Sequence, residues 1–229
     1  MDTKKFSIED VLKGGWHKTK EHFLFLFLTG LVYFVISMVL GSVNEGDFPV
    51  NTLSFLISVI FGVLFQVGMI KILMRITGNE KPDAHQFLAI TPGEFFRYIG
   101  CSILYGLAIL GGLILLIIPG IIIGIRLQFG YYFLIDKKMG PVEALKASWG
   151  ATRGQTWDLF LFTLVTIAIN IIGVLLLGLG LIITIPVTLI AVAYIYRAVS
   201  NAQMPQVIPE PAAIVPPPPH QDTPAPPVQ

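Results

Sequence analysis

Arg126 is the residue of this sequence whose chemistry most needs an explanation. It is the only formally charged residue between positions 98 and 135, in a run that is otherwise apolar. A charge at the centre of a membrane span costs about 2.5–3.5 kcal/mol, and such residues usually face a partner or a water-filled cavity. Arg126 follows Gly120 by six residues, about 9 Å along a helix, which predicts a position near mid-depth in a short span.

Two interpretations of Arg126 stay open at the level of sequence. The functional one is that the guanidinium coordinates an anionic headgroup or substrate. The structural one is that it snorkels to the outer surface or pairs with polar groups of neighbouring helices. The polar groups considered for that pairing are Gln66, Gln128 and Asn170.

The other reactive side chains form no catalytic or metal-binding pattern. Asp136 and Glu143 could do acid–base work, but no serine, histidine or metal partner is placed to use them. Glu143 is expected in the first turn of a helix, where the helix dipole favours an acid. Cys101 lies in an apolar run, as a small buried hydrophobe would. The four histidines lie far apart in sequence, at His17, His22, His85 and His220. We therefore predict no catalytic residue, no metal site and no cofactor, and a protein that is not an enzyme.

The composition is that of a membrane protein. Of the 229 residues, 54% are hydrophobic and only 13% are charged, and the mean hydropathy is +0.76. Soluble domains carry about 25% charged residues. The net charge of +1 argues against a nucleic-acid partner, which would require a basic surface.

The apolar runs predict an all-α polytopic membrane protein with six transmembrane helices. A helix needs about 20 apolar residues to cross the hydrocarbon core. The two apolar blocks 98–135 and 159–196 are too long for one helix each, and each holds an internal break, at Pro119-Gly120 and at Pro186. The predicted spans are about 23–41, 50–71, 97–118, 121–136, 157–178 and 182–198, arranged as three hairpins.

Glycines inside the apolar blocks are predicted to serve helix packing. Gly106 and Gly173 lie within apolar helices, so they belong to no phosphate-binding loop. Small residues let two membrane helices approach closely. The alternative is a flexible hinge that lines a pore.

The distribution of basic residues predicts the orientation. Fourteen of the fifteen Lys and Arg residues, all but Arg126, fall on one side of the six-span arrangement. Cytoplasmic loops carry the excess of Lys and Arg. Both termini are therefore predicted to be cytoplasmic.

Two similar amphipathic segments precede the first and third hairpins. When the two segments are aligned, Trp16 coincides with Trp149, and Lys13 coincides with Lys146. This similarity indicates an internal duplication, with a weaker analogue before the middle hairpin. Each copy is predicted to be an interfacial lead-in helix, since Trp and Lys favour the inner surface of the membrane. The predicted interfacial anchors are Trp16, Lys13, Trp149, Lys146 and Trp157.

The predicted domains are an interfacial helix over 1–22, a six-helix membrane domain over 23–200 and a tail over 201–229. The tail holds ten of the sixteen prolines from Met204 onward. We expect it to be disordered, because it cannot bury a core. It serves either as a spacer or as a docking site for a cytoplasmic protein, because a polyproline II segment loses little entropy on binding.

One stretch of the sequence also resembles a known family. The residues that carry the resemblance are Pro119-Gly120, Arg126, Pro141, Glu143-Ala144-Leu145, Ser148-Trp149, Thr152, Gly154 and Trp157. They look like the membrane domain attached to some bacterial glycerophosphodiester phosphodiesterases, and like related stand-alone six-helix proteins. The resemblance implies a multi-pass protein of the bacterial inner membrane. It does not transfer the phosphodiesterase, because that chemistry belongs to a separate soluble domain.

Two functions remain open from the sequence. The first is a non-enzymatic membrane protein that organises lipids or partner proteins, with the lipid bilayer as its main partner. The second is a transporter or channel for a small anion or lipid headgroup that uses Arg126. Transporters usually show several intramembrane polar groups around a midplane site. The sparse polar residues here favour the first.

Overall fold

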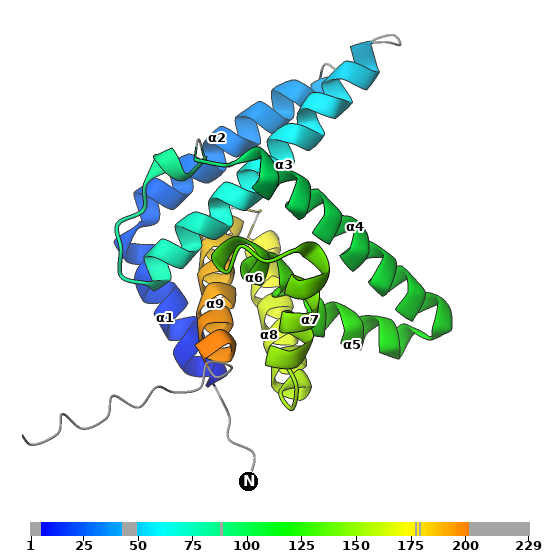
Figure 1. Cartoon of the computed structure of the whole chain (residues 1–229). Helices are drawn as coiled ribbons and strands as arrows, with labels where there is room; N and C mark the ends of the chain where they lie inside the picture. Colours follow the sequence, from blue (N-terminus) through cyan, green and yellow to red (C-terminus); the bar gives the residue numbers. More distant parts are fainter. Residues whose placement is uncertain (1–5, 43–49, 88, 177, 179, 202–229) are drawn as a thin grey trace, which may run out of the picture.

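The computed structural model describes residues 6–42, 50–87, 89–176, 178 and 180–201, and the regular secondary structure of these residues is entirely helical (Figure 1). Six of the helical stretches are long and apolar enough to cross a membrane. The predicted all-α, six-span fold class is therefore confirmed. Most of the proline-rich tail and of the first predicted outer loop lies outside the described residues.

The helices follow the predicted order closely. Their bounds are α1 (Ile8–Glu21), α2 (Phe23–Ser42), α3 (Val50–Thr77), the short 3-10 helix η2 (Ala84–Phe87), α4 (Pro92–Leu115), α5 (Ile117–Leu127), α6 (Gly130–Asp136), α7 (Pro141–Ala151), α8 (Thr156–Leu175) and α9 (Leu181–Asn201). The predicted fourth span corresponds to α5 and α6 together. A turn at Gln128 and Phe129 interrupts it.

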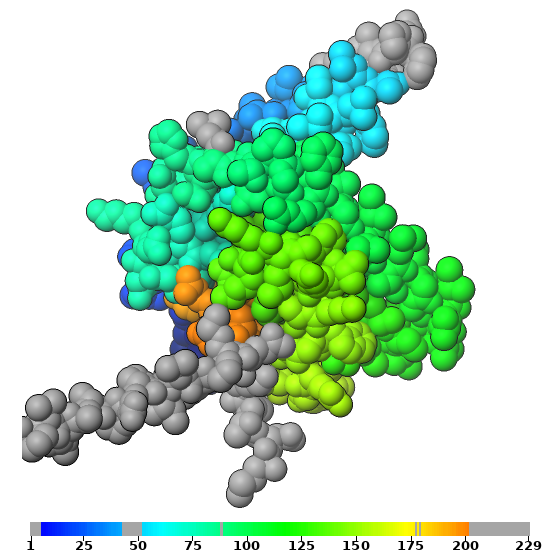
Figure 2. Space-filling model, viewed as in Figure 1, coloured from blue at the N-terminus to red at the C-terminus, as the bar shows by residue number. Residues whose placement is uncertain are grey.

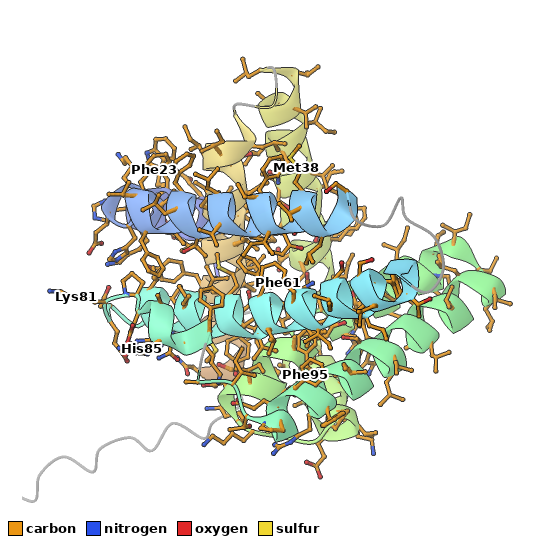
Figure 3. All side chains as sticks on the ribbon, turned by 90° about the horizontal axis from the view of Figure 1, so that it is seen from above. Phe23, Met38, Phe61, Lys81, His85 and Phe95 are labelled. Carbon is orange, nitrogen blue, oxygen red and sulfur yellow. The ribbon has the colours of Figure 1, made fainter. Side chains whose placement is uncertain are left out.

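The α2–α3 and α4–α5 hairpins project from the body at an angle to each other (Figure 1), and the α8–α9 hairpin extends in a third direction, which the view from above shows (Figure 3). In the space-filling view the α2–α3 hairpin projects clear of the body (Figure 2). Apolar side chains are exposed near the ends of the other two hairpins: Ile114 of α4 is 84% exposed and Leu175 of α8 is 76% exposed. Surfaces of this kind need a lipid environment.

The inner ends of the hairpins form the packed core. Tyr98 of α4, Phe133 of α6 and Tyr196 of α9 are all buried in one apolar cluster. Tyr196 stacks on Tyr132 with ring centroids 5.1 Å apart and meets Phe133 edge-on at 5.0 Å. Aromatic pairs of this geometry stabilise beyond their buried area. The core thus holds together the helix ends that carry most of the charges.

A pair of glycines closes the α4–α5 hairpin. A Cβ on Gly112 would lie 2.8 Å from the Cα of Gly120, so the two backbones touch. The reversal itself is at Leu116, which has an extended backbone between α4 and α5. The sequence predicted the break at Pro119-Gly120. Pro119 instead lies in the first turn of α5, where a missing N–H removes no helical hydrogen bond.

The α8–α9 hairpin has the same construction. A Cβ on Gly180 would lie 2.6 Å from the Cα of Gly173, and Gly178 in the turn has a φ of +75°. The prediction that Gly173 serves close helix packing is confirmed. The same prediction for Gly106 is wrong, because nothing lies within 4 Å of a Cβ built there. No other described helix packs against α4 at Gly106.

The two duplicated lead-in helices bind corresponding places on different hairpins. Ser148 of α7 donates a hydrogen bond to the carbonyl of Arg126 at 2.7 Å. A Cβ on Gly15 of α1 would lie 2.7 Å from the carbonyl oxygen of Val187. Gly15 and Ser148 occupy equivalent positions when the two lead-ins are aligned. Arg126 and Val187 are equivalent in turn when the α4–α5 and α8–α9 hairpins are aligned on Gly112 and Gly173.

The lead-ins therefore connect the three hairpins into a ring. α7 packs on α4 and α5 of the preceding hairpin, η2 packs on α3, and α1 packs along α9 of the last hairpin (Figure 1). Phe87 of η2 occupies a notch at Gly68, where a Cβ would clash with its ring. This arrangement brings α7 against the end of α5, where Arg126 lies.

Candidate functional site: the Arg126–Trp149 junction

Arg126 is the second-last residue of α5, ten residues after the turn at Leu116. Ten residues correspond to about 15 Å along the helix axis. Its side chain is half-buried. The depth of Arg126 in a membrane stays a prediction.

The guanidinium of Arg126 is bound to α7. Its Nη2 donates a hydrogen bond to the carbonyl of Trp149 at 2.8 Å. Its Cζ lies 3.6 Å from the centroid of the Trp149 ring. Trp149 is in the last turn of α7, where carbonyls lack helical partners and where the helix dipole favours a cation. One side chain thus makes a charged hydrogen bond, a dipole interaction and a cation–π contact.

The contact between the two helices is reciprocal. The carbonyl of Arg126 accepts hydrogen bonds from Ser148 Oγ at 2.7 Å and from Thr152 Oγ1 at 3.3 Å. Both hydroxyl side chains are fully buried. The end of α5 and the end of α7 are therefore joined by hydrogen bonds in both directions.

The partners that the sequence suggested for Arg126 are wrong. Gln66 accepts a hydrogen bond from Tyr98 at 2.8 Å, and Asn170 donates to the carbonyl of Thr166 at 2.8 Å. The amide nitrogen of Gln128 is buried without a partner among the described residues. The signal for the true partner was present, because Trp149 and Thr152 belong to the same motif as Arg126.

The predicted anchors lie in different surroundings. Trp16 is 45% exposed, and Lys20 of the same helix lies 5.2 Å from its ring centroid. Trp157 is 68% exposed and stacks on Phe160. Their place at the membrane surface stays a prediction.

The duplicated lysines also differ. Lys13 forms a 2.6 Å ion pair with Glu9, and their hydrogen bond lowers the pKa of the Glu9 carboxyl and raises that of Lys13. Lys146 lines a groove beside Trp149. Among the residues that the structure describes, Lys13 therefore has an acidic partner and Lys146 has none.

Three other cations near the inner ends of the hairpins also form hydrogen bonds to a neighbouring segment, as Arg126 does. Lys71 of α3 contacts the carbonyl of Ala89 at 2.8 Å and the carboxylate of Glu94 at 2.9 Å. Arg97 donates to the carbonyl of Lys138 at 2.8 Å. Arg197 of α9 donates to Thr77 Oγ1 at 2.8 Å and to the carbonyl of Met74.

Both carboxylates considered for acid–base work have structural partners. Asp136 accepts a hydrogen bond from the hydroxyl of Tyr196 at 2.6 Å and pairs with Lys137 at 3.2 Å. Glu143 accepts from the backbone N–H of Gly140 at 3.2 Å. Within the described part of the chain, no group of three or more His, Cys, Asp or Glu side chains could hold a metal ion.

The helical surface of the described residues includes the following two grooves. The larger, about 500 Å³, lies between α2, α3 and η2 and is lined almost entirely by apolar side chains. Figure 3 looks onto it from above, with α2 and α3 side by side and Phe61 between them. The smaller, about 280 Å³, lies between α4, α5 and α7 and includes Trp149 and Lys146.

These features define an all-helical protein of the membrane type, and the similarities of its sequence point to a bacterial family without assigned function. Residues 103–203 match a family described as "Protein of unknown function (DUF975)". The match includes the α5–α7 junction.

Proteins of similar sequence occur in mycobacteria. The chain is 24% identical over 238 residues to the uncharacterized protein Mb2590 of Mycobacterium bovis, and equally to the uncharacterized proteins MT2637 and Rv2560 of Mycobacterium tuberculosis. The alignment covers 91% of this chain and 73% of each relative. No solved structure matches. None of these relatives is named as a phosphodiesterase, so the resemblance to that membrane domain stays a prediction.

Proposed function

We propose that this chain is a non-enzymatic protein of the bacterial inner membrane that organises lipids or a partner protein around its helical hairpins. The observation that carries the proposal is the pairing of Arg126 with α7 through a 2.8 Å hydrogen bond and a cation–π contact. A site that transports an anion needs a cation that is available to bind it. The guanidinium of Arg126 is instead bound to Trp149 of α7.

The surface of the hairpins supports the same function. Large apolar side chains are exposed along α2, α4, α5 and α8. They give lipids an extended surface of contact, while four cations of the hairpins bind carbonyls, a carboxylate or a hydroxyl of the protein itself: Lys71, Arg97, Arg126 and Arg197. Such an arrangement suits a protein whose activity is contact with the membrane.

The orientation that we propose places both termini in the cytoplasm. It rests on the basic residues at the inner ends of the hairpins, which cytoplasmic loops favour. The proline-rich tail from Met204 would then be available to a cytoplasmic protein. The tail lies outside the described residues, so its composition alone supports this part of the proposal.

The test is capture of the full chain in polymer discs that retain native lipid. Anionic lipids or a specific protein are expected at several times their abundance in discs from the same membrane that lack the chain. A variant that ends at Ala202 should lose any partner of the tail while retaining the lipids. Recovery of bulk lipid composition and no enriched protein would contradict the proposal.

A second candidate function is transport of a small anion or lipid headgroup through Arg126. The observation that favours it is that Arg126 Nε and Gln128 Nε2 are buried without hydrogen-bond partners among the described residues. Proteoliposomes loaded with radiolabelled phosphate or glycerol 3-phosphate test it. Efflux above that of protein-free vesicles, abolished by Arg126→Gln, would replace the first function by the second.

A further inference from the structure

The smaller groove combines an apolar floor with a basic and aromatic rim. Its lining consists of Leu104 of α4, Leu127 of α5, and Val142, Leu145, Lys146 and Trp149 of α7. Val142 is 51% exposed and Trp149 is 40% exposed. The groove is thus an open surface where three helices from two hairpin units meet.

We place this groove near the boundary between headgroups and acyl chains, shallower than the mid-depth that the sequence predicted for Arg126, because Trp149 of the predicted interfacial helix α7 lies against the Arg126 guanidinium. Leu104 follows Arg97, the last charged residue on α4, by seven residues, or about 10 Å of helix. Amphipathic helices at a membrane surface bury their apolar face about 5–10 Å below the headgroups. A molecule in the groove would therefore meet an acyl environment at Leu104 and a polar one at Lys146.

The charge of the groove is positive. Lys146 is exposed and makes no ion pair or hydrogen bond with any residue that the structure describes. The guanidinium of Arg126 lies against the Trp149 ring, and Arg153 is exposed just beyond the end of the same helix. The acidic residue of α7, Glu143, has its carboxylate at the N–H of Gly140. The rim therefore complements an anion.

We infer that the groove between α4, α5 and α7 binds one anionic phospholipid of the inner leaflet. The acyl chain lies against Leu104, Leu127 and Val142, and the phosphate is held by Lys146. The inference rests on the proposed function and narrows it, because it names the class of lipid and the residue that selects it.

The duplicated helix α1 offers a matched comparison within the same chain. Lys13 stands at the repeat position of Lys146 but is paired with Glu9 at 2.6 Å. The buried face of α1, with Val11 and Gly15, is packed along α9. The lysine of the repeat is therefore paired with an acidic side chain in α1, whereas its counterpart in α7 is exposed at the rim of the groove.

Tryptophan fluorescence can measure the lipid beside the groove directly. The chain has three tryptophans, so Trp16→Phe and Trp157→Phe together leave Trp149 as the only reporter. The full chain with these two changes is reconstituted in vesicles that mix unlabelled lipid with a phospholipid brominated on its acyl chain. Quenching is compared for brominated phosphatidylglycerol and brominated phosphatidylcholine, which gives the relative affinity of the site for each.

The expected result is a preference for phosphatidylglycerol of about fivefold or more, the factor that corresponds to the attraction of one lysine for an anionic surface. Lys146→Gln should reduce this preference to near one, Lys146→Arg should keep it, and Lys13→Gln should leave it unchanged. High salt should weaken it, since the contact is exposed.

Equal quenching by the two lipids would overturn the inference, and so would a preference that survives Lys146→Gln. Circular dichroism of the Lys146→Gln variant checks that the helices remain intact. If the polymer discs retain anionic lipid while Trp149 shows no preference, the groove assignment fails and the proposed function stands. If both measurements show bulk lipid, both fail.

Discussion

Gly112→Ala should separate the two helices of the α4–α5 hairpin. The added Cβ would lie 2.8 Å from the Cα of Gly120, 2.8 Å from Cδ1 of Ile123 and 3.1 Å from the Gly120 nitrogen. Ordinary contacts of this kind begin near 3.4 Å. The Ile123 side chain can rotate away, but the α5 backbone cannot. It must move by about 0.6 Å to lengthen the contact with the Gly120 Cα from 2.8 Å to the ordinary 3.4 Å.

The cost of this overpacking is about 1–3 kcal/mol in the free energy of unfolding. Alanine also has a higher helix propensity than glycine by about 1 kcal/mol, which opposes the loss. Gly106→Ala on the same helix supplies the control, because nothing lies within 4 Å of its Cβ. Both variants gain the same helix propensity, so the difference between their free energies of unfolding reports the steric cost at Gly112 alone.

The assay is reversible unfolding in mixed micelles with increasing denaturing detergent, followed by far-ultraviolet circular dichroism. Gly112→Ala should be less stable than Gly106→Ala by about 1–3 kcal/mol. Equal unfolding midpoints would refute the close glycine contact and the position of the hairpin turn at Leu116.

Three further predictions concern the inner ends of the helices. Arg197→Met should destabilise the protein by about 3 kcal/mol in the same unfolding assay, since it removes two charged hydrogen bonds between α9 and α3; wild-type stability would show that these bonds contribute nothing. Lys71→Met should cost up to about 3 kcal/mol because it leaves the mostly buried carboxylate of Glu94 unpaired, and Glu94→Gln added to it should restore part of the loss, whereas a further decrease would contradict the pairing. In a Cys101→Ala background, a cysteine at Ser7 should react with a membrane-impermeant maleimide only after the cell membrane is opened, and labelling of intact cells would reverse the proposed orientation.

Sequence patterns were sufficient to predict the helices and to single out Arg126 as a residue that needs a partner. Long uncharged runs can satisfy their backbone in lipid only as helices, so the six spans follow from length and hydropathy. A single arginine in such a run requires an energetic explanation wherever it lies. The duplication is also visible in space, since Gly15 and Ser148 meet backbone carbonyls at corresponding places.

The partner of Arg126 and the position of the turn could not be derived in the same way. Trp149 lies on another helix, and its carbonyl is available only because α7 ends there. Helical periodicity describes one helix at a time and carries no information about how two helices dock. Pro119 was misleading for a local reason, because the first turn of a helix tolerates a residue without an N–H.

The claim that Arg126 binds α7 rather than a ligand is tested most directly by a double-mutant cycle. The free energy of unfolding is measured for Arg126→Met, for Trp149→Leu and for the two combined. Trp149→Leu leaves the backbone carbonyl in place, so the coupling reports the cation–π contact at 3.6 Å. A coupling energy of about 1 kcal/mol is expected. Additive effects within about 0.3 kcal/mol would contradict the cation–π contact. Wild-type stability of Arg126→Met would contradict a structural role for Arg126 at this junction, because that variant also removes the hydrogen bond to the Trp149 carbonyl.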